Sequence, residues 1–106
     1  MDLSKKKCIA CEGGMPPMPP WLVKKYLKEV KGWKIKNDHL YKEFKFKDFK
    51  TTLKFVNYFS NISVNEVHHP DIYFTWGKCN IELWTHAVNG LSENDFILAA
   101  KIDKIK

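Results

Sequence analysis

The chain has 106 residues, 44% of them hydrophobic and 14% aromatic, so it can build one domain with a modest core and has no room for a second. Its net charge of +6 comes from 18 basic residues against 12 acidic ones, and every basic residue is a lysine. Arginine is the side chain that reads guanine and grips phosphate with two hydrogen bonds, so its absence argues against sequence-specific DNA recognition, and no nucleic-acid partner is expected.

The chain contains no run of about 18 apolar residues, which is the length that a membrane-spanning helix needs. The basic residues near the N-terminus are not followed by the apolar stretch of a secretory signal. We therefore expect neither a membrane span nor secretion, and an intracellular protein of the cytoplasm or the nucleus.

Residues 1–20 are rich in cysteine, glycine and proline, and their glycine pair and two proline pairs interrupt regular helices and central strands. Cys8 and Cys11 have the C-x-x-C spacing of zinc and redox sites. Zinc would need a second ligand pair at similar spacing, and a redox motif would need a strand before it and a helix opening at it. We therefore predict reduced thiols in a loosely ordered arm over residues 1–20, packed on a single domain of residues 21–106.

After this arm, apolar residues recur at helical spacing with lysines between them, and Gly32 stands where a helix stop is expected. This pattern predicts an amphipathic helix over residues 20–31. Residues 33–46 alternate with a period of two around a polar break at residues 37–39, which predicts a β-hairpin. His39 lies at that break, and we interpret it as an exposed loop residue outside any site.

Residues 47–65 return to helical spacing, with Asp48 as a plausible cap. Two strands follow over residues 71–76 and 79–86, joined by a two-residue loop, and Glu82, Trp84 and His86 share one face of the second strand. The final segment predicts a helix, because Ser92 and Asp95 have the spacing of a capping box. The order of elements predicts an α+β fold, with three helices on one face of a four-stranded antiparallel sheet.

Three of the four histidines lie in the stretch from residue 66 to residue 95. His68 and His69 precede Pro70 in the predicted turn from helix to strand, and His86 ends the second strand. Because imidazole titrates near neutral pH, histidines gathered in one cleft can both give and take protons. Three histidines could also bind zinc. Adjacent His68 and His69 seldom reach one metal together, however, and no other ligand cluster is evident, so no metal site is expected.

The spacing of these residues resembles the signature of the pterin-4a-carbinolamine dehydratases, which are also known as dimerisation cofactors of a homeodomain transcription factor. His68-His69-Pro70 is followed after five residues by Trp76, after nine more by His86, and after eight more by Asp95. The family's T-H-x-x-x-G-L segment is present as residues 85–91, and the likeness covers about residues 21–105. The chain has Val64 where the family pattern has an ionisable side chain.

The resemblance implies the dehydration of a 4a-hydroxytetrahydropterin to the quinonoid dihydropterin, in tetrahydrobiopterin recycling, without a metal or an organic cofactor. It implies acid and base roles for His68 and His86, and a role for His69 in orienting the pterin or its hydroxyl. Asp95 would hold an imidazole in one tautomer, a role that can coexist with capping a helix.

The same resemblance suggests a substrate-binding set outside the histidines. Trp33 and Trp76 would form an aromatic wall, although both are equally readable as core residues, and Glu66 is a candidate in place of Val64. The expected partners are a reduced pterin and further copies of the chain, in a homodimer or homotetramer. An alternative function is a protein-binding module that acts as a transcriptional coactivator without catalysis.

Overall fold

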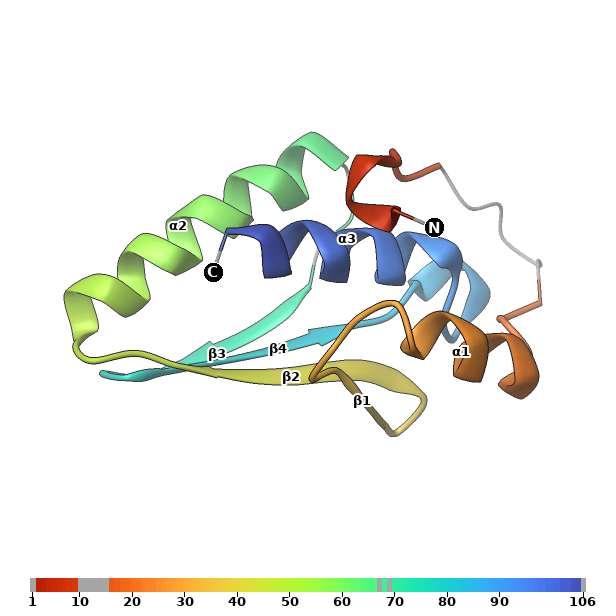
Figure 1. Ribbon diagram of the computed structural model, residues 1–106, viewed down its shortest axis with the longest axis horizontal. Helices are drawn as coiled ribbons and strands as arrows, with labels where there is room; N and C mark the ends of the chain where they lie inside the picture. Colours follow the sequence, from red (N-terminus) through yellow and green to blue (C-terminus); the bar gives the residue numbers. More distant parts are fainter. Residues whose placement is uncertain (1, 10–15, 67, 69, 106) are drawn as a thin grey trace.

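A computed structural model describes residues 2–9, 16–66, 68 and 70–105 of the chain. Two short 3-10 helices, three α-helices and four strands follow one another along these residues (Figure 1). Their order is η1 (Leu3–Lys5), α1 (Pro20–Leu27), β1 (Lys34–Lys36), β2 (His39–Lys45), α2 (Phe49–Glu66), β3 (Asp71–Phe74), β4 (Lys78–Leu83), η2 (His86–Val88) and α3 (Glu93–Lys104). No helix among the described residues has the length and apolar character needed to cross a membrane.

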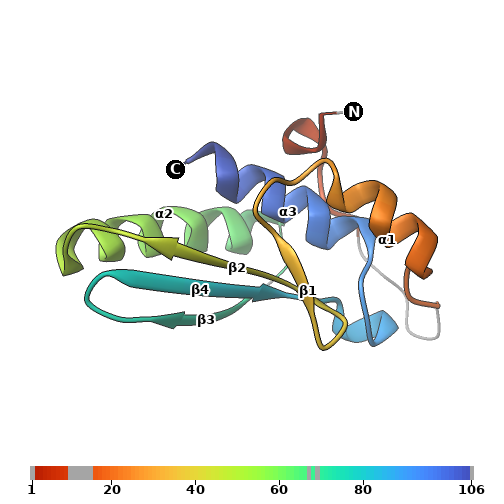
Figure 2. The same ribbon diagram turned by 60° about the horizontal axis from the view of Figure 1, so that its bottom comes forward.

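The four strands form one antiparallel sheet in the order β1-β2-β4-β3. The three α-helices lie on one side of this sheet, and its other face is open (Figures 1 and 2). This architecture confirms the predicted α+β fold. The pairing of Asp71 with Glu82 sets the start of β3 beside the end of β4, so the segment before β3 and the segment after β4 leave the sheet at the same end.

The core lies between the sheet and the helices α2 and α3. Alternate residues of β4, namely Cys79, Ile81 and Leu83, are fully buried beneath the helices, as the period of a strand requires. The helices contribute a larger apolar set, which includes Phe55, Phe59, Phe96, Ile97, Leu98, Ala99 and Ile102. Because α3 is buried along most of its length, the residues of its first turn are held in a rigid setting.

Two predicted boundaries differ from the structure. The first helix ends at Leu27 rather than at residue 31, because the chain turns there and brings Val30 into the core. The first hairpin turns at Asn37 and Asp38 alone, both with positive φ, as a tight two-residue turn of primed type requires. His39 is consequently the first residue of β2 rather than a loop residue.

The second hairpin is also displaced by one residue from its predicted position. The Thr75 N–H donates to the Lys78 carbonyl oxygen over 2.8 Å, so Trp76 and Gly77 occupy the centre of the turn. A side chain at Gly77 would approach the Phe46 carbonyl oxygen to 2.9 Å, which explains the need for glycine at this place. The sequence pattern instead predicts the loop at Gly77 and Lys78.

Residues 2–9, which fall in the arm expected to be loosely ordered, pack against α3; we call them the N-terminal strap. Leu3 is only 2% exposed and belongs to the core. Lys101 donates a 2.8 Å hydrogen bond to the Ser4 carbonyl oxygen, and Lys6 pairs with Glu93 at 3.2 Å. The glycine pair and Cys11 lie outside the described residues.

A hydrogen bond between α1 and α3 supports a first test of the packing. The Tyr26 hydroxyl donates to Glu93 Oε2 over 2.6 Å, and it is the main cause that lowers the pKa of the Glu93 carboxyl below its ordinary value. Tyr26→Phe keeps the ring beside Phe96 but removes this bond. Because the Glu93 side chain is 34% exposed, we expect a loss of about 1 kcal/mol in the free energy of unfolding at neutral pH.

The same substitution should have a pH signature. Since the folded-state pKa of Glu93 lies below its ordinary value of 4.5, the stabilisation is complete above that value and is lost as the pH falls through the folded-state pKa. Urea unfolding at neutral pH and at about pH 3 gives the free energy of unfolding of the wild-type and Tyr26→Phe proteins. The difference in this free energy between the two proteins should be smaller at the lower pH. An equal difference at both values would contradict the assignment.

Candidate active site

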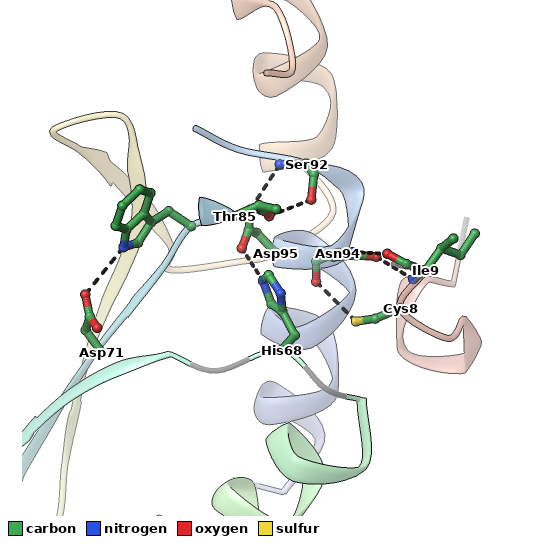
Figure 3. A network of polar contacts seen from close by, with 9 residues as sticks. Cys8, Ile9, His68, Asp71, Thr85, Ser92, Asn94 and Asp95 are labelled. Atoms are coloured by element: carbon green, nitrogen blue, oxygen red, sulfur yellow. Dashed lines mark hydrogen bonds and ion pairs between the residues drawn. The ribbon is translucent and has the colours of Figure 1, made fainter. Parts of the chain in front are cut away.

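The sequence-predicted residues His68 and Asp95 meet in a buried pair. His68 Nε2 lies 2.6 Å from Asp95 Oδ1; His68 is 9% exposed and Asp95 is fully buried (Figure 3). His68 comes from the connection between α2 and β3, where its N–H donates to the Ser63 carbonyl oxygen at the end of α2 over 3.1 Å. Asp95 comes from the first turn of α3. The segment that follows α2 and the first turn of α3, which are distant in sequence, therefore meet at the His68 imidazole.

The second carboxylate oxygen of Asp95 accepts two further hydrogen bonds. The Thr85 hydroxyl donates to Oδ2 over 2.9 Å and the Ser92 N–H over 3.0 Å (Figure 3). The second bond belongs to the capping box of α3, which confirms that part of the prediction. These contacts fix the carboxylate, which therefore holds the imidazole ring of His68 in one orientation.

This arrangement selects one form of the His68 imidazole. An ionised carboxylate offers only acceptors, so the proton of a neutral ring sits on Nε2, and Nδ1 then carries a lone pair. A fixed imidazole with a lone pair at a known atom can take a proton from a ligand. The buried pair can thus work as a base whose orienting group is already in place.

His86 lies at the same end of the sheet, although it is in η2 rather than in the strand that was expected to end with it. Its neighbour Thr85 is the residue that hydrogen-bonds to Asp95. The His86 ring is exposed, and its centroid lies 3.8 Å from that of Trp84. The structure therefore brings a buried imidazole and an exposed one to neighbouring positions around Thr85.

Three other predicted site residues have different surroundings. Glu66 ends α2, and its Oε1 accepts a 2.8 Å hydrogen bond from the Cys8 N–H of the strap. Trp33 is 4% exposed in the core, and its indole N–H donates to Asp103 at the far end of α3. His69 lies outside the described residues, so its predicted role stays a prediction.

Trp76 stands at the opposite end of the hairpin from His68, because it follows β3 whereas His68 precedes it. Its carbonyl oxygen accepts a hydrogen bond from Thr52 near the start of α2, and Glu66 lies 14 positions further along this helix, about 21 Å away. Trp76 is 65% exposed. Within one chain, Trp33 and Trp76 do not form a wall beside His68.

The structure also shows a residue that the sequence reasoning set aside. The His39 ring stacks on Trp84, with centroids 4.4 Å apart and planes 12° from parallel, and its Nδ1 lies 2.9 Å from Glu82 Oε2. The alternation of the strands could have indicated this contact, since Leu40 pairs with Leu83 and so sets His39 opposite Trp84. The predicted turn includes His39, so the predicted strand pairing does not contain this contact.

The described residues contain no group of three or more histidine, cysteine or acidic side chains that could hold a metal ion. Burial raises the pKa of the Cys8 thiol to about 12 and that of the Cys79 thiol to about 11, so both thiols are protonated at neutral pH. A protonated thiol is a poor nucleophile and a poor metal ligand. Neither thiol is therefore a candidate nucleophile at neutral pH.

Comparisons with known proteins show which family the chain resembles. The model of the family described as pterin 4 alpha carbinolamine dehydratase matches residues 16–105. A Rickettsia canadensis protein is 52% identical over 103 residues, 95% of this chain and 94% of its own length, and one from Alkaliphilus metalliredigens is 47% identical over 105 residues, 97% of this chain and 95% of its own. Both carry the provisional name pterin-4-alpha-carbinolamine dehydratase.

A solved structure has the same fold. The crystal structure described as a transcriptional coactivator/pterin dehydratase from Brucella melitensis superposes with a TM-score of 0.81 at 26% identity. The match covers 84% of this chain and 97% of that one. The N-terminal strap, residues 2–9, lies outside the part of the chain that the family model matches.

Proposed function

Because this chain belongs to the pterin 4 alpha carbinolamine dehydratase family, we propose that it is a hydro-lyase that converts a 4a-hydroxytetrahydropterin into the quinonoid dihydropterin and water. The bond from the 4a carbon to the hydroxyl oxygen breaks, and a proton leaves the adjacent ring nitrogen. The observation that carries this proposal is the buried pair of His68 and Asp95, which supplies an oriented base.

We assign the base to His68 and the acid to His86. The Nδ1 lone pair of His68 takes the proton from the ring nitrogen, and Asp95 stabilises the imidazolium that results. His86 gives a proton to the leaving hydroxyl, which departs as water. After each turnover the exposed His86 ring regains a proton from solvent, and His68 gives up the proton that it took, so no net proton is consumed. His69 is assigned to orienting the pterin, as the family resemblance implies.

The proposed reaction needs neither a metal nor an organic cofactor, because two groups that titrate near neutrality supply both proton transfers. The proposed setting is the recycling of tetrahydrobiopterin in the cytoplasm. Glu66, Trp33 and Trp76 are not assigned to pterin binding within one chain, since Glu66 holds the strap, Trp33 is buried and Trp76 lies at the far end of the sheet.

The direct test is an assay of the purified protein. We expect it to accelerate the decay of chemically generated 4a-hydroxytetrahydropterin, followed by the absorbance of the quinonoid dihydropterin, above the rate in buffer. Heat-denatured protein and free imidazole at the concentration of the protein's histidines serve as controls. A rate equal to that of the free imidazole would reject the proposed function.

Assembly of several copies is a further part of the proposal. Strands β1 and β3 are the two edges of the sheet, and β3 presents Ile72 and Tyr73 at 40% and 66% exposure. An exposed edge strand can pair with a second chain, which would give a homodimer or homotetramer. Light scattering on the eluting protein measures the mass, and a monomer at micromolar concentration would count against assembly.

A second candidate function, binding of another protein as a transcriptional coactivator, has one specific support besides the description of the Brucella structure. Helix α2 carries several large apolar side chains at its exposed surface: Phe49, Leu53, Tyr58 and Val64. A helical partner could cover them. Capture of such a partner that persists in a His68→Gln variant would show that binding is independent of catalysis.

A further inference from the structure

His86 is exposed, and the Trp84 ring is what confines it. Among the described residues, His86 has no side-chain hydrogen bond or ion pair, and its ring contact is with Trp84, with centroids 3.8 Å apart and planes tilted by 36°. An exposed side chain without polar partners exchanges between rotamers on a fast timescale. The position of Trp84 therefore decides where the His86 imidazole points.

Trp84 in turn is held from a neighbouring strand. His39, the first residue of β2, lies across from it and stacks on the indole almost in parallel, at 4.4 Å between centroids. The Trp84 indole N–H also reaches Asp71 Oδ2 at 3.4 Å, a long and correspondingly weak hydrogen bond. The stacked His39 ring thus supports a face of the indole, whereas Asp71 contacts only its N–H.

His39 is itself fixed by a third residue. Its Nδ1 lies 2.9 Å from Glu82 Oε2, on the strand that leads to Trp84, and both side chains are largely shielded from solvent. The result is a row of contacts from Glu82 through His39 and Trp84 on the open face of the sheet to His86 in η2 beyond it. Each side chain in this row restricts the rotamers of the next.

We propose that His39 is a positioning residue of the dehydration reaction, which acts by holding Trp84 and, through it, the imidazole of His86. This inference rests on the proposed function, in which His86 is the acid. His39 does not contact the reacting atoms. Its contribution is to keep the proton donor in one orientation, because small displacements of an oriented group have large effects on rate.

The test uses the full chain and two substitutions at one position. His39→Ala removes the ring from Trp84, and His39→Phe keeps a ring while it removes the bond to Glu82. We expect His39→Ala to lower kcat about tenfold with little change in KM. His39→Phe should keep most of the wild-type kcat. Lys78→Gln, on the same face at the other end of β4, is the matched control and should retain wild-type kcat.

A second readout does not depend on activity. The carbon-bound protons of the His86 ring lie close enough to the Trp84 indole for its ring current to shift their NMR signals, which a His86→Gln variant assigns. In His39→Ala these signals should move towards those of free imidazole, and in His39→Phe they should stay near the wild-type position. If His39→Ala fails to fold, as circular dichroism would show, His39→Gln replaces it.

The inference would be overturned if the His86 signals do not move in His39→Ala. It would also be overturned if His39→Ala and the wild-type protein have equal kcat. If the wild-type protein has no dehydratase activity while the signals move as expected, the proposed reaction fails but the positioning of His86 by His39 stands. The two failures are therefore distinguishable.

Discussion

His68→Gln is expected to lower kcat/KM for pterin dehydration by about 10²-fold or more, while the protein stays folded. A glutamine amide can still donate a hydrogen bond to Asp95 from a place near that of Nε2, so the buried carboxylate keeps a partner. The amide has no basic lone pair near neutral pH, so it cannot take the proton from the pterin. The loss should fall on kcat, because the base acts in the transition state.

Initial rates over a range of substrate concentrations measure this effect, after the spontaneous reaction is subtracted. Asn61→Gln, at an exposed place on α2, is the matched control and should keep wild-type rates. Thermal unfolding must show that both variants remain folded. A His68→Gln protein with more than half of the wild-type kcat/KM would remove His68 from the mechanism.

Asp95→Ala is expected to lower the free energy of unfolding by about 3 kcal/mol or more. Asp95 is fully buried, and its loss would remove an acceptor from three groups: the His68 ring, the Thr85 hydroxyl and the Ser92 N–H. The Thr85 hydroxyl would keep its 2.7 Å contact with the Ser92 hydroxyl. It also removes one half of the capping box of α3. The penalty for unpaired buried polar groups exceeds that for the loss of a surface contact.

Urea unfolding compares this variant with Asp48→Ala, which removes only the cap of α2. Asp48 Oδ1 accepts a 2.7 Å hydrogen bond from the Thr51 N–H, and the loss of this one cap bond outside the core should cost less than the loss of a buried carboxylate with three partners. Asp95→Ala should therefore destabilise the protein clearly more than Asp48→Ala. Equal losses would mean that Asp95 is only a cap and that its bond with His68 adds little.

Local patterns were sufficient to predict the architecture of this chain. Helical and strand periods identify three helices and four strands, and the capping box of Ser92 and Asp95 marks the start of α3 correctly. The errors occur where a local signal is short. The turn at Asn37 and Asp38 is tighter than its polar residues indicate, and the other hairpin is displaced by one residue.

The site could be predicted only in part. Alternation placed Trp84 and His86 on one face of a strand, and the family spacing singled out His68 and Asp95. The contact between His68 and Asp95 joins residues 27 positions apart, and it depends on how the end of α2 meets the start of α3. The stack of His39 on Trp84 depends on register, which a one-residue error in a turn hides.

The contacts of the N-terminal strap join parts of the chain that are far apart in sequence. Cys8 and Ile9 bond to Asn94, next to Asp95, and the Cys8 N–H bonds to Glu66, two residues before His68. These contacts with Asn94 span 85 and 86 residues of sequence, and contacts between such distant segments carry a high loop-closure cost in folding. The strap therefore ties its own ordering to that of the two elements that carry the buried pair.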